Sequence, residues 1–352
     1  MAAPQASYAD ERFYADDPIL GWRLIPGLNL EFSNHADFRV RLRTDERGLR
    51  IGELPPTNPA ILVVGDSFAF GWGVEADETF AAQAAASAGG AIWNAGVPLY
   101  DVCQAVDRAT ELLSVLRPRI VVVGVFQGND EFDALTDRHG FEIEAGAIVP
   151  RSKLGAAERL RHSTWQLAVD HSHLLRLLRR SPPIDWVRTH VVGEISFSRW
   201  VARQRLAVYR VPASPEILEG SGRLMACVER LRDRSASEGA ALVVVLLPDQ
   251  LELEPERLAA IASWLEESGG AVDPAAPRGR LIPALAALEV PVVDPLGELL
   301  RAHDRVELYF RQDPHMTAAG HAIVARVLAP TLSGLLSVPG GPVGAARKAD
   351  PT

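Results

Sequence analysis

The sequence predicts a doubly wound α/β domain, in which helices cover both faces of a parallel β-sheet. Two observations predict it: short, nearly continuous apolar runs recur along the chain, and helical stretches separate them. Strands buried on both faces need apolar residues on both sides, and parallel strands need crossover connections. The predicted strands are 60–65, 91–96, 119–126, 241–248 and 290–294, and the predicted helices are 78–88, 101–116, 222–236, 255–267 and 317–330.

Three segments stand outside this alternation. Residues 1–59 contain "DPILGWRLIPGLNLEF" and "FRVRLRTDERGLR", which predict short strands and turns packed on the core domain of 60–335. Residues 151–221 are rich in Arg and Trp and predict a mostly helical cap inserted into that domain. The tail, 336–352, is rich in small residues and predicts disorder.

The composition is that of a soluble globular protein, since 47% of the 352 residues are apolar and 23% are charged. The formal charge of −9 argues against a nucleic-acid partner, which requires a basic surface.

The sequence has no apolar run of the roughly 18–20 residues that span a bilayer. The start lacks the pattern of a secretory signal. A cytoplasmic location is therefore expected, and a periplasmic or secreted one stays open if a leader has been removed.

The two cysteines, Cys103 and Cys227, lie far apart in the sequence, each in a segment that is predicted to be helical. Their spacing fits neither a disulfide framework nor a zinc site, so we expect two separate buried thiols. His171 and His173 lie two residues apart, which on a helix places them on different faces and argues against a metal site.

The stretch "GDSFAFGWGV" (65–74) follows the first predicted strand, and ligands of doubly wound sheets sit beyond the carboxyl ends of strands. It lacks the second glycine of a dinucleotide fingerprint and the lysine of a phosphate loop. A serine at such a strand-to-helix turn, Ser67, projects its hydroxyl clear of the sheet. Its N–H then lies near a helix N-terminus, where developing negative charge is favoured.

A serine nucleophile needs a base, and "YFRQDPHMTAAGHAIVARVL" near the end of the chain supplies one. Asp313 can accept a hydrogen bond from Nδ1 of His315, which leaves Nε2 free for the serine. Thr317 is a plausible N-cap for the helix that follows. His321 is the rival base, but it falls inside that helix, so we favour His315.

Two further stretches at strand ends offer donors for an oxyanion. Gly96 in "NAGVPLYD" can bring its backbone N–H close to a reacting carbonyl, and Asn129 in "GNDEFD" offers a side-chain amide. Each alone is a turn signal. Their coincidence at successive strand ends favours a site. Trp72, five residues after Ser67, is expected to be either a pocket wall or a core anchor.

These blocks, in this order, resemble the SGNH hydrolase superfamily, also called GDSL esterases and lipases. The resemblance implies a three-layer, flavodoxin-like sheet with Ser67 as nucleophile, His315 as base and Asp313 orienting it. It also implies an oxyanion hole formed by the N–H groups of Ser67 and Gly96 and by the Asn129 side chain. Classical α/β-hydrolases fit less well, since Ala69 replaces the last glycine of their G-x-S-x-G elbow.

The sequence departs from the common pattern of this family in the last block and in the block around Gly96. Asp-x-His stands in place of Asp-x-x-His, as in a branch that resembles alginate O-acetylation proteins. "GVPLYD" has leucine where bacterial relatives often have glycine.

The resemblance implies an esterase that cleaves a small acyl or acetyl ester, on a carbohydrate or natural product, through an acyl-enzyme. The alternatives are an O-acyltransferase of the same fold and a non-catalytic binding domain. No cofactor and no metal are expected. The sequence gives no indication of oligomeric state.

Overall fold

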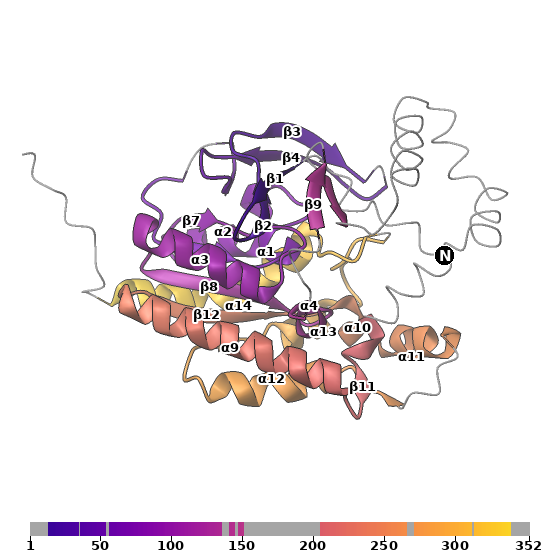
Figure 1. Ribbon diagram of the computed structural model, residues 1–352. Coiled ribbons are helices and arrows are strands. Elements are labelled where there is room, and N and C mark those ends of the chain that lie inside the picture. Colours follow the sequence, from indigo (N-terminus) through magenta and orange to yellow (C-terminus); the bar gives the residue numbers. More distant parts are fainter. Residues whose placement is uncertain are drawn as a thin grey trace, which may run out of the picture.

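The computed structural model describes residues 13–34, 36–53, 56–135, 141–144, 147–150, 205–265, 271–311 and 313–338. An eight-stranded sheet lies at its centre, with the strand order β14-β12-β8-β6-β7-β5-β4-β3 (Figure 1). Its parallel part consists of the five predicted strands, found as β6 (Ile61–Val64), β7 (Ile92–Asn94), β8 (Ile120–Phe126), β12 (Ala241–Leu247) and β14 (Val292–Val293). In chain order these strands run 5-4-3-1-2 across the sheet. This is the flavodoxin-like order, so the predicted fold class is confirmed.

The N-terminal segment extends this sheet. β3 (Asn29–Ser33), β4 (Arg39–Thr44) and β5 (Arg50–Ile51) are antiparallel, and β5 pairs with the edge strand β7 of the parallel part. The other strands form two-stranded sheets: β1 (Tyr14–Asp17) with β2 (Gly21–Leu24), β9 (Phe141–Glu144) with β10 (Ala147–Pro150), and β11 (Arg210–Val211) with β13 (Ala271–Val272).

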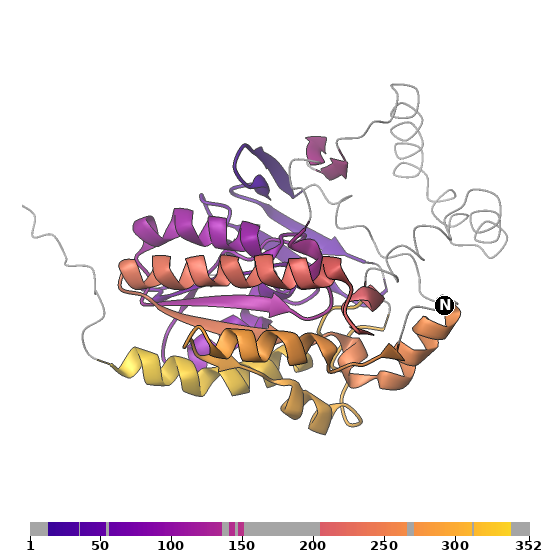
Figure 2. The same ribbon diagram turned by 60° about the horizontal axis from the view of Figure 1, so that its bottom comes forward.

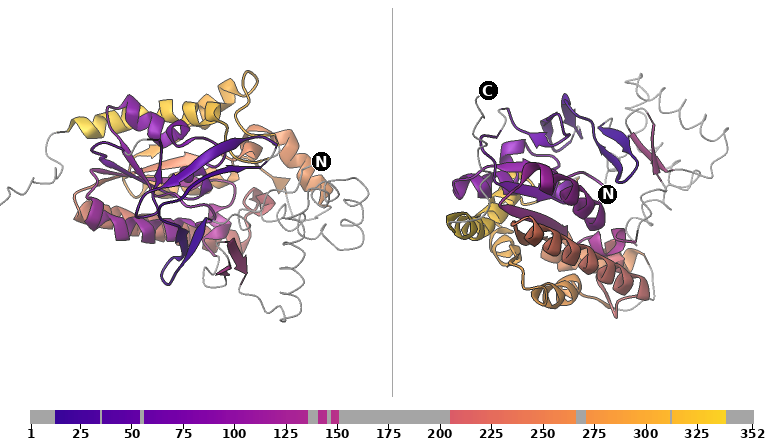
Figure 3. Two further views of the ribbon diagram at one scale, coloured as in Figure 1. Left: turned by 90° about the horizontal axis from the view of Figure 1, so that it is seen from above. Right: turned by 60° about the vertical axis from the view of Figure 1, so that its left-hand side comes forward.

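Helices cover both faces of the sheet (Figures 2 and 3). One face carries α3 (Val102–Leu116), α9 (Pro215–Ser237) and α12 (Ala276–Ala286), and the other carries α2 (Phe80–Ser87), α13 (Leu296–Ala302) and α14 (Ala318–Ser337). Short helices lie in the connections: α1 (Ser67–Phe70), the 3₁₀ helix η2 (Ala76–Glu78), α4 (Asp130–Asp133), α10 (Gln250–Leu253) and α11 (Pro255–Trp264).

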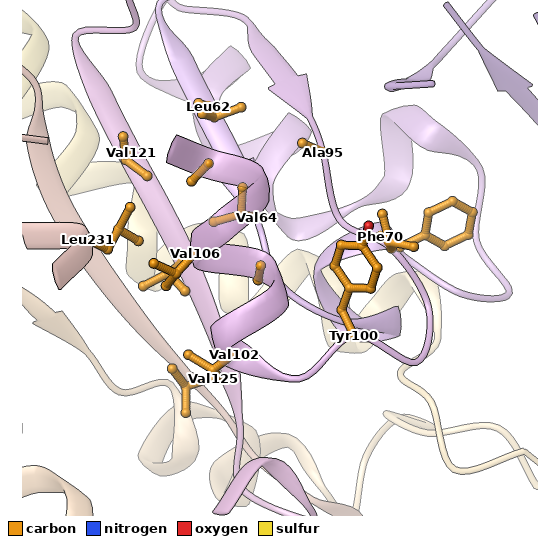
Figure 4. Close-up of a cluster of buried hydrophobic side chains, with 14 of the residues drawn as sticks. Leu62, Val64, Phe70, Ala95, Tyr100, Val102, Val106, Val121, Val125 and Leu231 are labelled. Atoms are coloured by element: carbon orange, nitrogen blue, oxygen red, sulfur yellow. The ribbon is translucent and has the colours of Figure 1, made fainter. Parts of the chain in front are cut away.

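Alternate residues of each strand point to opposite layers, as the pleat requires. Leu62 and Val64 of β6 belong to the cluster under α3 and α9, part of which is drawn in Figure 4. Ile61 and Val63 belong to the cluster under α2 and α14. This double burial explains why the strands read as continuous apolar runs.

Two boundaries differ by seven residues from the sequence prediction. α9 begins at Pro215, inside the predicted insertion 151–221, because Ser214 caps it and accepts a hydrogen bond from the Ile217 N–H. α14 continues to Ser337, past its predicted end at 330 and into the predicted tail, with Pro330 in its interior. Residues 151–204 of the insertion, with His171 and His173, lie outside the described residues, as do tail residues 339–352.

Within the described part of the chain, α14 is the one helix long and apolar enough to cross a bilayer. It is a helix of the core, since Val324, Leu328 and Leu332 are buried in the cluster shared with α2. This packing accounts for its apolar composition.

The two cysteines form a disulfide, so the prediction of separate thiols is wrong. Cys103 of α3 and Cys227 of α9 have Cα atoms 5.3 Å apart, although 124 residues separate them in sequence. The two helices pack side by side on one face of the sheet. A crossover topology creates this proximity, which spacing along the sequence does not reveal.

Removal of this bridge is expected to destabilise the fold. The variant Cys103→Ser/Cys227→Ser should lose about 2–4 kcal/mol of unfolding free energy, because the unfolded chain regains the entropy of a long loop. Urea denaturation measures it, and a reductant should destabilise the native chain while leaving the variant unchanged. Titratable thiols in the unfolded, non-reduced protein would contradict the bridge.

Candidate active site

Ser67 lies at a sharp turn between β6 and α1. Gly65 makes the turn possible, because a side chain there would meet the Ala69 Cβ at 2.7 Å and the Gly124 carbonyl oxygen at 3.0 Å, and its φ is +146°. The Asp66 carboxylate caps α1 and accepts a hydrogen bond from the Phe68 N–H at 2.9 Å. Ser67 is thus the first residue of α1, and its N–H has no acceptor within the helix.

The structure brings Ser67, His315 and Asp313 into one hydrogen-bonded chain. The Ser67 Oγ lies 2.7 Å from Nε2 of His315, and Nδ1 of His315 lies 2.5 Å from Oδ1 of Asp313. Nδ1 carries the proton in this arrangement, because the carboxylate can only accept. Nε2 is then an acceptor for the serine hydroxyl.

Trp72 completes the chain on the far side of Asp313. Its Nε1–H donates to Oδ2 of Asp313 at 3.2 Å, while the His315 backbone N–H donates to Oδ1 at 3.0 Å. Burial alone would raise the pKa of Asp313, but the charge and hydrogen bonds of His315 and the Trp72 bond outweigh it and lower this pKa below its ordinary value. Trp72 is therefore a buried anchor that also holds the carboxylate, a role that the sequence did not reveal.

His321, the rival base, lies elsewhere in the fold. It is 1% exposed, its Nδ1 accepts a hydrogen bond from the Phe80 N–H at 3.1 Å, and its ring stacks on Phe80. Burial lowers the pKa of His321 to about 3, so the imidazole is neutral. Its role is to accept a hydrogen bond from the first residue of α2. Thr317 caps α14 as predicted, since its Oγ1 accepts a hydrogen bond from the Gly320 N–H.

Two buried side chains hold the carboxyl end of α1. Arg50 and Asn94 face each other in the antiparallel pair of β5 and β7. The Arg50 guanidinium donates to the carbonyls of Phe70, Gly71 and Val74, at 2.7 Å for Phe70. The Asn94 Nδ2 donates to the carbonyl of Ala69 at 3.2 Å. Burial lowers the pKa of Arg50 to about 10, which still leaves it charged at neutral pH.

Gly96 packs against α1, and its N–H is engaged within the protein. That N–H donates to Oδ1 of Asn94 at 3.0 Å, whereas the sequence interpretation assigned it to an oxyanion. A Cβ at Gly96 would lie 2.4 Å from the Phe70 N. The glycine is thus required for close contact between the β7 loop and the nucleophile turn.

Leu99 lies in the loop that follows β7 and has a left-handed backbone conformation. Its φ of +68° lies in the left-handed region that glycine favours, and its side chain is 40% exposed. Leucine here places an apolar side chain on the surface of the loop that follows β7.

Asn129 follows β8 and occupies the N-cap position of α4. Its Nδ2 donates to Oδ2 of Asp133 at 2.6 Å. Strands β6 and β8 are parallel neighbours, so Asn129 and Ser67 follow strand ends at the same edge of the sheet.

Three carboxyl groups near these strand ends have raised pKa values. Burial raises the pKa of Asp66 to about 6 and that of Asp133 to about 7, and it raises that of Asp130 well above its ordinary value. At neutral pH they therefore carry less negative charge than ordinary aspartates. In the described ranges, no group of three or more His, Cys, Asp or Glu side chains is arranged to hold a metal ion.

A family model matches the C-terminal part of the chain. Residues 216–347 match the SGNH hydrolase-like domain of the acetyltransferase AlgX. The match contains Asp313 and His315, whereas Ser67, Gly96 and Asn129 precede it. A search of curated proteins found no significant sequence match.

Several solved structures of hydrolases are similar to this chain at low identity. LAE5, an alpha/beta hydrolase from the metagenome of Lake Arreo, Spain, is 10% identical, with a TM-score of 0.41 over 81% of this chain and 99% of its own. The lipase/acylhydrolase of Enterococcus faecalis is 12% identical, with a TM-score of 0.39 over 78% and 95%. A catalytic mutant of Axe2, an acetylxylan esterase from Geobacillus stearothermophilus, is 11% identical, with a TM-score of 0.40 over 79% and 95%.

The substitution Arg50→Met is expected to destabilise the protein. It removes the guanidinium that donates to three buried carbonyls of the nucleophile turn, which should cost about 2–4 kcal/mol of unfolding free energy. Chemical denaturation measures the loss, and Arg41→Met, at an exposed position of β4, is the matched control. Equal stability of the two variants would show that Arg50 does not hold the turn.

Proposed function

We propose that the chain is a serine esterase of the SGNH hydrolase type, which cleaves a small acyl ester through an acyl-enzyme. The match of residues 216–347 to an SGNH hydrolase-like domain supports this proposal. One observation carries the proposal: the 2.7 Å contact between the Ser67 Oγ and a His315 whose other ring nitrogen is bonded to Asp313. This is the geometry that removes a proton from a serine hydroxyl as it attacks.

In the first half-reaction, the Ser67 Oγ attacks the ester carbonyl carbon while Nε2 of His315 takes the hydroxyl proton. The carbonyl oxygen becomes an oxyanion, for which the Ser67 N–H and the Asn129 amide are the proposed donors. His315 then gives the proton to the leaving alcohol, and the C–O bond of the ester breaks. The acyl group stays on Ser67.

In the second half-reaction, an acceptor O–H attacks the acyl carbon while Nε2 of His315 takes its proton. His315 then returns the proton to the Ser67 Oγ as the bond between the acyl carbon and that oxygen breaks. Water as acceptor gives hydrolysis. A sugar hydroxyl as acceptor gives O-acyl transfer, and the match to the SGNH hydrolase-like domain of an acetyltransferase favours this as the second candidate. The same match supports acetyl as the acyl group.

The location of the protein is also a proposal. Disulfides persist in oxidising compartments and are rare in the cytosol of most organisms. The Cys103–Cys227 bridge therefore supports a periplasmic or secreted location over a cytoplasmic one.

Replacement of Ser67 by Ala tests the proposed chemistry. The wild-type protein should hydrolyse p-nitrophenyl acetate, and Ser67→Ala should lower the rate at least about a thousandfold, because no acyl-enzyme can form. A fluorophosphonate should label Ser67 and no other residue, as mapped by mass spectrometry. Equal rates in both proteins, or a label elsewhere, would refute the assignment.

Candidate sugar acceptors added to the same assay distinguish water from a sugar hydroxyl as the acceptor, since an acylated sugar appears only with transfer.

Replacement of Trp72 by Phe tests the donor to Asp313. The ring packing is kept and the Nε1–H is lost, so kcat should fall about tenfold, as expected for the loss of one hydrogen bond to a charged group. KM should stay nearly constant. The control is Trp93→Phe, in β7, where the ring packs on the hydrophobic core. A kcat equal to that of the control would show that the hydrogen bond from Trp72 to Asp313 does not contribute to catalysis.

A further inference from the structure

The bond between Asn129 and Asp133 assigns a role to a residue to which the sequence analysis gave none. We propose that Asp133 is a positioning residue, which holds the Asn129 amide so that its second N–H is available to the oxyanion. This inference rests on the proposed function, because it concerns the donor used in that reaction. Asp133 itself touches no reacting atom.

The first observation is that Asn129 does not cap its own helix. Asparagine at an N-cap normally accepts a hydrogen bond from a backbone N–H of the first turn. Asn129 occupies the N-cap of α4 but makes no such bond. Its Nδ2 instead donates to Asp133, one helical turn later, at 2.6 Å. The side chain is therefore withdrawn from capping and held by the carboxylate.

The second observation concerns the two ends of the amide. The Asn129 Oδ1 is buried and has no hydrogen-bond partner among the described residues, so the bond from Nδ2 to Asp133 is the one that fixes the amide there. An amide nitrogen carries two hydrogens, and the carboxylate uses one of them. The remaining N–H keeps a defined direction only while Asp133 accepts the first.

The third observation is that α4 is itself anchored. Glu131 forms a two-point ion pair with Arg280, at 2.9 Å from Nε and 2.5 Å from Nη2. Gly220 of α9 packs directly against the Glu131 carbonyl, with no room for a Cβ. Oδ2 of Asp130 accepts the Phe126 N–H at 2.7 Å. The Asp133 carboxylate thus projects from a fixed support.

Three variants test whether the carboxylate acts as an acceptor. At pH 8.5, above the pKa of about 7 that burial gives Asp133, Asp133→Ala should lower kcat about tenfold with KM changed less than about twofold. Asp133→Asn keeps an oxygen that accepts from Nδ2, so it should retain most of the activity. The control is Asp107→Ala, which removes a carboxylate of α3 that forms an ion pair with Arg230 of α9, and it should match the wild type.

A double-mutant cycle tests whether Asp133 acts through Asn129. Asn129→Ala should lower kcat about a hundredfold, as loss of one oxyanion donor does. In that background Asp133→Ala should cause no further loss beyond about twofold. Independent, multiplicative losses would overturn the inference, and so would a kcat for Asp133→Ala equal to that of the wild type. A merely structural role predicts a lower melting temperature with an unchanged kcat per fluorophosphonate-reactive enzyme.

A replacement variant and the dependence of the rate on Ser67 allow each result to be interpreted. If Asp133→Ala does not fold, Asp133→Leu fills the same space without an acceptor and takes its place. Failure of the proposed function itself would appear as a wild-type rate that does not depend on Ser67. A multiplicative cycle in an enzyme that does depend on Ser67 overturns only the role of Asp133.

Discussion

The buried carboxylate of Asp313 is the constraint on which the arrangement of the site depends. A carboxylate removed from water must be hydrogen-bonded or paired, and each oxygen of Asp313 has donors: His315 at Oδ1 and Trp72 at Oδ2. His315 lies in the loop before α14, and Trp72 lies in the loop after the nucleophile turn. Satisfying one anion therefore draws together segments that are 241 residues apart. Ser67 and His315 meet because their loops share this partner.

The N-terminal strands contribute to the same result. β5 carries Arg50 into the interior beside Asn94 of β7, and together they bind the carbonyls that end α1. Asn94 also accepts the N–H of Gly96, so one amide joins the nucleophile turn to the loop after β7. Residues before the parallel sheet thus belong to the support of the site.

The parts that follow local pattern could be predicted from the sequence. The parallel strands are buried on both faces and read as apolar runs, and Ser67, Asp313 and His315 lie in blocks whose residue types match one chemistry. The missed features are contacts between distant segments. The partner of Trp72, the pairing of Cys103 with Cys227 and the engagement of the Gly96 N–H all depend on which elements the topology places side by side. The residues that neighbour each of these positions in the sequence do not indicate which elements the fold places side by side.

The disulfide between α3 and α9 has a topological consequence. It closes a covalent ring that contains β8, α4 with Asn129, and the whole of residues 136–204, whereas Ser67 and His315 lie on the two arms outside it. A peptide bond cut anywhere inside the ring leaves one covalently joined molecule. The nucleophile and its base then stay on the same species, and the two fragments separate only after reduction.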